Sequence, residues 1–242
     1  MTQAYQSWLV KGKILIEQAQ IAPETGGALL EEAARCFAQI GDLRWQSFAL
    51  HLRFRKRSST DSPEQLENWA QTAQAGYRQS YDRLGEIRLL IDWANLAAAS
   101  QNVHLGLSRL RQAQALAQGL PMAAQVLGHL AYWQASLGEY DRALDSLDLA
   151  LHQGGEADPE LLGWILEQLS FSLCRLFRPK EGERFYIKAL KQYLDQNHWE
   201  GVERVYQNLL RLEKTLGVGF SRSELGLRVR ALLKRQGLLS LV

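Results

Sequence analysis

Apolar and polar residues alternate along the chain with the period of an α-helix almost from end to end. The clearest stretch lies between residues 127 and 151. Its apolar residues recur three, four and seven positions apart, the spacing that places them on one helical face. Gly138 and Glu139 interrupt the rhythm, which resumes through Ala143, Leu147 and Leu151. This pattern predicts two short amphipathic helices joined by a tight turn.

Weaker copies of this helical hairpin follow one another through the sequence. One hairpin cannot bury its apolar face alone, whereas stacked hairpins cover one another. Alternating Val/Ile/Thr runs bounded by turns are missing, so strands are not expected. We therefore predict an all-α fold, an α-α superhelix or solenoid, in a single domain over residues 1–242. About six antiparallel helix pairs are expected, over residues 2–40, 42–80, 86–118, 121–152, 159–193 and 198–236.

Capping residues mark several of the predicted helix ends. Ser62-Pro63 and Asp158-Pro159 each combine a cap with a proline that suits the first helical position. Ser221 and Glu224 have the spacing of a capping box for the last helix, and Gly217 is expected to end the helix before it.

The hairpin at 127–151 resembles the tetratricopeptide repeat family. Leu130-Ala131 matches the large and small positions of that family's first helix, and Gly138-Glu139-Tyr140 matches its turn. Ala143, Leu147 and Ala150-Leu151 match the second helix, whereas Gln134 stands where an aromatic residue is usual. The other hairpins keep only part of the pattern, and their spacing exceeds the family's repeat of about 34 residues. The resemblance implies an irregular, tetratricopeptide-like array.

The same resemblance implies that the first helix of each pair lines a concave, partner-binding face. The projected residues mix arginines, amides and aromatics, the side chains that often anchor peptides. For each of them, an ordinary solvated or packed position is the competing interpretation. They are Arg88, Ile91, Asn95, Gln125, Tyr132, Glu167, Phe171, Arg175, Arg204, Gln207 and Arg211.

Net charge adds little, because 28 basic residues against 26 acidic ones leave only +2. This balance argues against a dedicated nucleic-acid coat. The last helix is locally basic through Arg228, Arg230, Lys234 and Arg235. These residues fit either a solubilising end cap or a contact with nucleic acid or an anionic surface.

Catalytic and metal-binding patterns do not emerge. The five histidines are scattered, and none has a ligand partner at metal-site spacing. We expect no catalytic residue, no metal and no cofactor. Cys36 and Cys174 fit free thiols in a reducing compartment, and the N-terminal residues lack a signal-peptide pattern. A cytoplasmic protein without a transmembrane segment is therefore expected.

These features predict a non-enzymatic scaffold, adaptor or assembly factor that binds a segment of a partner protein. An acidic segment suits Arg88, Arg175 and Arg211, which come from three different first helices. The alternative is a regulatory helical-repeat protein that contacts nucleic acid or an anionic surface through its basic C-terminal helix. Homo-oligomers fit either hypothesis.

Overall fold

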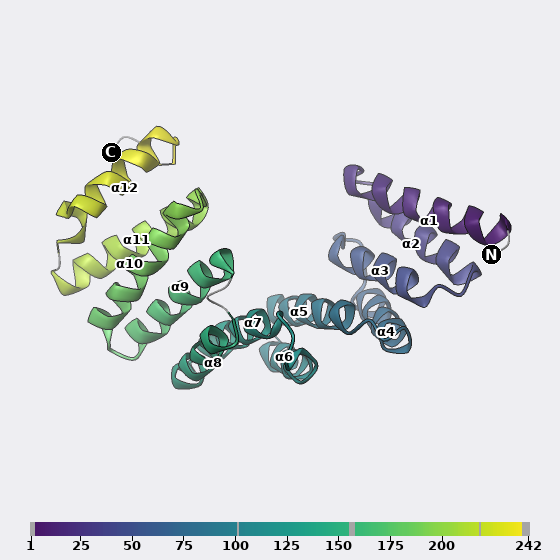
Figure 1. Cartoon of the computed structure of the whole chain (residues 1–242), viewed down its shortest axis with the longest axis horizontal. Helices are drawn as coiled ribbons and strands as arrows, with labels where there is room; N and C mark the ends of the chain where they lie inside the picture. Colours follow the sequence, from purple (N-terminus) through teal and green to yellow (C-terminus); the bar gives the residue numbers. More distant parts are fainter. Residues whose placement is uncertain (1–2, 101, 155–157, 218, 239–242) are drawn as a thin grey trace. The chain divides into compact units, whose positions relative to one another are not determined.

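The computed structural model describes residues 3–100, 102–154, 158–217 and 219–238, and these form twelve α-helices, one 3-10 turn and no strand (Figure 1). The all-α class is confirmed. The elements are α1 (Gln3–Ile21), α2 (Gly26–Gln39), α3 (Leu43–Arg55), α4 (Pro63–Gln79), α5 (Arg83–Ala99), α6 (Val103–Ala117), α7 (Ala123–Ser136), α8 (Tyr140–His152), α9 (Pro159–Arg175), α10 (Pro179–Asp195), α11 (Trp199–Leu216), η2 (Phe220–Arg222) and α12 (Glu224–Arg235).

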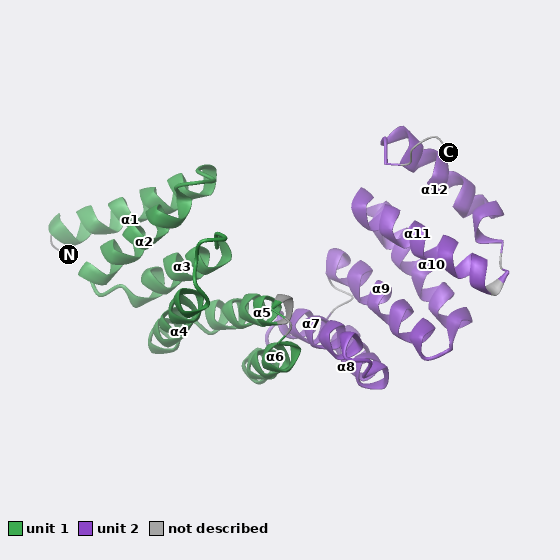
Figure 2. Cartoon of the chain, turned by 180° about the vertical axis from the view of Figure 1, so that it is seen from behind, with its two compact units in different colours: residues 1–117 green, residues 118–242 purple. Residues whose placement is uncertain are grey.

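The helices divide into two compact units, residues 1–117 and residues 118–242 (Figure 2). In the first unit α1 packs on α2, α3 on α4 and α5 on α6. In the second unit α7 packs on α8, α9 on α10 and α11 on α12. Successive pairs stack through α2 on α3 and α4 on α5, and through α8 on α9 and α10 on α11. The predicted pairs are confirmed within the described residues, and a single continuous array over the whole chain stays a prediction.

One turn geometry joins many of these helices. After α2, α4, α7, α9 and α10, a backbone N–H bonds to the carbonyl five residues earlier, as in Asp42 to Phe37 and Arg178 to Leu173. The residue just before that donor adopts a left-handed conformation, which glycine reaches without strain. Glycine fills this position after α2 and α7, but Tyr81, Phe177 and Asn197 fill it after α4, α9 and α10.

The predicted caps are confirmed at three of four places. Ser62 forms a capping box with Gln65, and the Asp158 side chain accepts bonds from two backbone N–H groups. Gly217 ends α11 in a left-handed conformation. The capping box predicted at Ser221 is wrong. Ser221 lies in the 3-10 turn bonded to Glu213, and Ser223 caps α12 instead.

Small residues let the paired helices approach closely. A Cβ atom on Gly106 would lie 2.9 Å from the Ala94 carbonyl oxygen, and one on Gly182 would lie 2.9 Å from that of Ser170. Ala131 and Ala143 hold the same places in the α7–α8 pair, and both are fully buried. At these positions the backbones nearly touch, which leaves no room for a larger side chain.

We predict that Ala143→Leu destabilises unit 2 by about 1–3 kcal/mol, because the added methyl groups have no space between α7 and α8. Chemical denaturation measures the loss. Ala231→Leu is the control, since Ala231 is exposed on α12 and the same change there adds no buried volume. Equal stability of the two variants would contradict the close approach of α7 and α8.

Candidate partner-binding surfaces

In unit 1, helices α3 and α5 contact each other and border a small polar cleft. Its volume is about 150 Å³, room for about five water molecules. Two of its lining residues are apolar, and the other four are polar or charged. The lining residues are Phe54, Arg55, Arg57, Asp92, Asn95 and Leu96.

Asp92 organises this cleft. Its Oδ2 atom lies 2.9 Å from Nε2 of buried His51 and 3.4 Å from Nε of Arg55. The other His51 ring nitrogen lies 3.3 Å from the Tyr77 hydroxyl, and burial raises the pKa of Tyr77 above its usual value. The carboxylate is thus held between a histidine and an arginine, while Arg57 has no ion pair within the described part of the chain.

Two other cations near the end of α3, Arg53 and Lys56, contact groups within unit 1. Arg53 donates to Glu31 and forms a bidentate pair with Asp61, holding the pKa of that carboxyl near 2, and its guanidinium stacks on Trp69. Lys56 donates to the carbonyls of Ala19 and Ala22 at the end of α1. Neither side chain is available to a partner.

Three predicted binding residues belong to α5. Arg88 is exposed and has no ion pair with a described carboxylate. Asn95 lines the cleft. Ile91 is only 5% exposed and belongs to the core, so it offers no surface to a partner. Helical spacing placed Ile91 and Arg88 on the same side of α5. It does not show which part of that side is covered by neighbouring helices.

Sequence reasoning missed His51, Arg55 and Asp92. Asp92 did carry a signal, because a carboxylate within the apolar run of α5 must find partners when it is buried. Its partners lie on α3, about 40 residues earlier, and helical periodicity does not reveal contacts between helices.

In unit 2, two exposed aromatic side chains mark the first helices α7 and α9, which contact each other. Tyr132 is 42% exposed, and its ring stands edge-on to Trp133. Phe171 is 43% exposed and packs edge-on against Tyr140, with ring centres 6.4 Å apart. Nε of Arg175 donates to the Tyr140 hydroxyl at 2.9 Å. Phe171, Arg175 and Tyr140 therefore form one partly exposed cluster.

Glu167 and Arg204 also lie in this unit, and they stabilise its fold. Glu167 is 4% exposed, and both of its oxygens accept bonds from Arg204 at 2.7 Å. The Tyr193 hydroxyl donates to the same carboxylate at 3.2 Å. This network joins α9, α10 and α11, and it strongly favours the charged form of Arg204, whose pKa is raised. The pair is committed to the fold, so Glu167 offers no surface to a partner.

The remaining predicted residues of the face are exposed or half-buried. Gln125 on α7 and Arg211 on α11 are exposed, and Gln207 is half-buried. Arg211 makes one long contact of 3.5 Å with Asn208 and no ion pair with a described carboxylate. Because Arg88 belongs to unit 1, a concavity shared by Arg88, Arg175 and Arg211 stays a prediction.

The basic C-terminal helix α12 packs on α11 and η2 through Val229 and Leu233, which are fully buried. These two residues form the apolar seam of α12, whereas Leu227 on the same helix is 55% exposed. The four predicted basic residues are exposed and have no ion pair in the described residues: Arg228, Arg230, Lys234 and Arg235.

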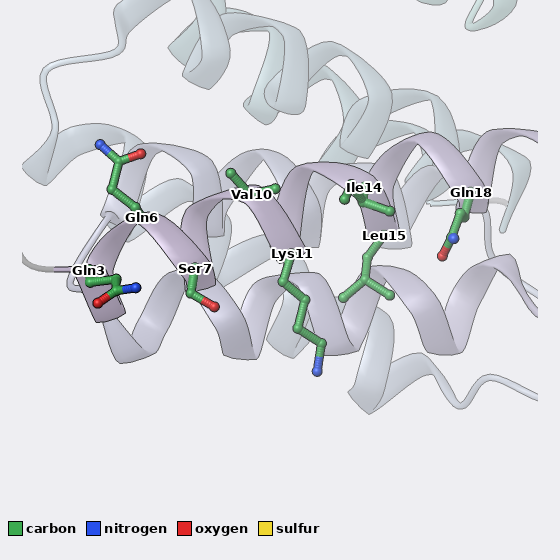
Figure 3. Close-up of a pocket in the computed structure, with 8 residues that line it drawn as sticks. All are labelled: Gln3, Gln6, Ser7, Val10, Lys11, Ile14, Leu15 and Gln18. Atoms are coloured by element: carbon green, nitrogen blue, oxygen red, sulfur yellow. The ribbon is translucent and has the colours of Figure 1, made fainter.

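A different hollow, of about 610 Å³, runs along α1 (Figure 3). Val10 and Ile14 give it exposed apolar surface, and its polar groups are amides and one hydroxyl. Its one cation, Lys11, pairs with Glu32 at 2.7 Å. This side of α1 offers apolar surface without free charge, unlike the arginine-bearing faces.

Among the described residues, no cluster of three or more His, Cys, Asp or Glu side chains could hold a metal ion. Within the same residues, no helix is long and apolar enough to cross a membrane. Cys36 and Cys174 are both free thiols, and burial raises the pKa of each.

Solved structures share this architecture. One is a Signal Transduction ATPase with Numerous Domains (STAND) protein with a tetratricopeptide repeat sensor from Pyrococcus horikoshii, with a TM-score of 0.75 and 13% identity over 98% of this chain and 38% of the other. Another is a Rap protein complexed with Competence and Sporulation Factor, with a TM-score of 0.58 and 13% identity over 86% of this chain and 65% of the other. The chain thus spans about two fifths and two thirds of their lengths.

A third similar structure is BtubC from P. vanneervenii, with a TM-score of 0.52 and 15% identity over 100% of this chain and 95% of the other. No family model matches the sequence, and no relative is found among curated proteins. The structural likeness confirms the fold that the sequence resemblance implied: this is a helical-repeat protein with a tetratricopeptide-like architecture.

We predict that Glu167 stabilises the folded protein, whereas Arg211 does not. Glu167→Gln should lower the free energy of unfolding by about 1–3 kcal/mol, because it weakens two charged hydrogen bonds at a buried carboxylate. Arg211→Gln should change it by less than about 0.5 kcal/mol, since Arg211 is exposed and has no ion pair with a described carboxylate. Urea unfolding of both variants tests the contrast, and a stable Glu167→Gln protein would contradict it.

Proposed function

We propose that this protein is a non-enzymatic interaction scaffold that binds an acidic segment of a partner protein on the first-helix faces of its repeats. One observation carries the proposal. On the first helices, the arginines at positions 44, 55 and 204 pair with acids, whereas Arg88, Arg175 and Arg211 have no ion pair with a described carboxylate.

Exposed aromatic rings on two of the first helices, α7 and α9, support the same function. Tyr132 and Phe171 keep about two fifths of their surface open to solvent. Rigid aromatic side chains and arginines supply much of the binding energy in protein interfaces. The Rap structure contains a bound factor on a similar fold, and this supports a segment-binding role for the present chain.

Charge reversal tests the proposal. A variant with Arg88, Arg175 and Arg211 changed to Glu should remain folded and should lose most binding to peptides selected by the wild type from a displayed random library. Like charges would then face the acidic segment. Fluorescence polarisation with the selected peptides measures the loss.

The matched control changes three exposed cations of second helices, Arg111, Lys180 and Lys191, to Glu. It alters the net charge equally but leaves the first-helix faces intact, so binding should persist. Equal loss in both variants would show a nonspecific charge effect, and failure to select any peptide would contradict the proposed function.

The second candidate function is a contact between α12 and nucleic acid or an anionic surface. It is favoured by the exposure of Arg228, Arg230, Lys234 and Arg235, which no described acid neutralises. End caps of helical repeats show the same character. The two interpretations differ in their response to salt.

We expect α12 to act as a cap. Changing its four basic residues to Gln should leave stability and peptide binding unchanged, because Val229 and Leu233 keep the apolar seam. Binding of fluorescent single-stranded RNA, duplex DNA and anionic vesicles is measured at low and high salt. Salt-dependent binding by the wild type that the Gln variant lacks would favour the second function instead.

A further inference from the structure

The turn that follows α9 combines two unfavourable features at one residue. Phe177 adopts a left-handed conformation with φ of 59°, and its side chain is 94% exposed. A left-handed backbone disfavours a residue with a Cβ atom, and full exposure of a phenyl ring forgoes its burial. Gly138 holds the equivalent turn position after α7, so the fold accepts glycine there.

Neither cost is offset within the described residues. Phe177 makes no ring contact with them, and only its backbone N–H bonds, to the Cys174 carbonyl. Strained residues and exposed apolar residues are both typical of functional sites.

The end of α9 bears the cluster of Phe171, Arg175 and Tyr140. Arg175 is the last residue of α9, two positions before Phe177. The hydrogen bond from Arg175 to Tyr140 places the first residue of α8 beside the end of α9. The turn before α8 contains Leu137, which is partly exposed. We call Leu137, Tyr140, Phe171, Arg175 and Phe177 the α9-end cluster.

The charges of the cluster specify the ligand. Neighbouring charges are already paired, Arg142 with Glu139 and Arg178 with Glu181, at 3.2 and 2.8 Å. Arg175 keeps its guanidinium without a described carboxylate and bonds only to a neutral hydroxyl. The site thus offers one free cation among several exposed apolar side chains.

We propose that the α9-end cluster is the anchor point for a peptide segment in which a bulky apolar residue adjoins a carboxylate. Arg175 binds the carboxylate, and Phe171 and Phe177 cover the apolar side chain. The carboxylate comes either from an Asp or Glu side chain or from the peptide's C-terminus, which share this chemistry. This inference rests on the proposed function, since it names the ligand and the anchoring residues of a segment-binding scaffold.

Tyr81 provides a matched control inside the same protein. It holds the equivalent turn position after α4, with φ of 56° and the same 94% exposure. Its neighbours are engaged internally: Asp82 pairs with Arg44, and Arg83 bonds to the Leu116 carbonyl. Tyr81 thus shares the strain and exposure of Phe177 without its cluster.

The experiment compares Phe177→Gly, Tyr81→Gly and Arg175→Gln, using peptides selected by the wild type from a displayed random library and then synthesised with free or amidated C-termini. Neither glycine variant should lower the melting temperature, because glycine relieves the left-handed strain. Phe177→Gly and Arg175→Gln should each weaken binding about tenfold, as expected for anchor residues. Tyr81→Gly should change it by less than about twofold.

Each outcome decides between explanations. Selected peptides should combine a bulky apolar residue with an adjacent acid, and loss of affinity on amidation would identify the C-terminal carboxylate as the group bound. Peptides that bind Phe177→Gly and Arg175→Gln like the wild type, but fail to bind Arg211→Glu, would overturn the anchor and leave the proposed function intact. If the wild type selects no peptide, the proposed function itself fails.

Discussion

The architecture depends on how closely two helices of a pair can approach. In the α5–α6 and α9–α10 pairs, a glycine Cα lies against a backbone carbonyl with no room for a Cβ atom. Larger residues at these crossings would push the helices apart and open the layer that Leu110, Leu147 and Leu190 fill. Because every further pair stacks on the one before it within a unit, an error at one crossing would propagate to the surfaces beyond it.

This constraint explains why the sequence predicted the all-α class and the pairing of the helices. Small residues, helix-ending glycines and caps such as Ser62 and Asp158 are local signals, and each is decided by its own few neighbours. The cap predicted at Ser221 is wrong because the Ser221 hydroxyl donates to Glu213 on the preceding helix, α11. Ser221 lies in the 3-10 turn and not at the start of α12. The left-handed conformation of Phe177 could not be predicted from the sequence either, since glycine is the usual signal for that turn.

The candidate surfaces were harder to predict, because they depend on contacts between helices. In both units the hydroxyl of a buried tyrosine forms a hydrogen bond with a side chain 26 residues earlier: Tyr77 with His51, and Tyr193 with Glu167. The sequence placed Glu167 and Arg204 on the predicted binding face, but it could not show that they form an ion pair with each other. A residue's position on a helix indicates where it can point, and its partners decide whether it is free to bind.

Charged side chains that have partners therefore stabilise the fold, whereas those without an ion pair are the ones that we propose for binding. Buried or bidentate charges such as Arg53 and Glu167 would leave uncompensated charges behind if a ligand drew one partner away. Arg175 and Arg211 have no ion pair with a described carboxylate, so a carboxylate from a ligand can pair with them without that cost. This difference, together with the left-handed and exposed Phe177, is the basis on which we propose an anchor point at the end of α9.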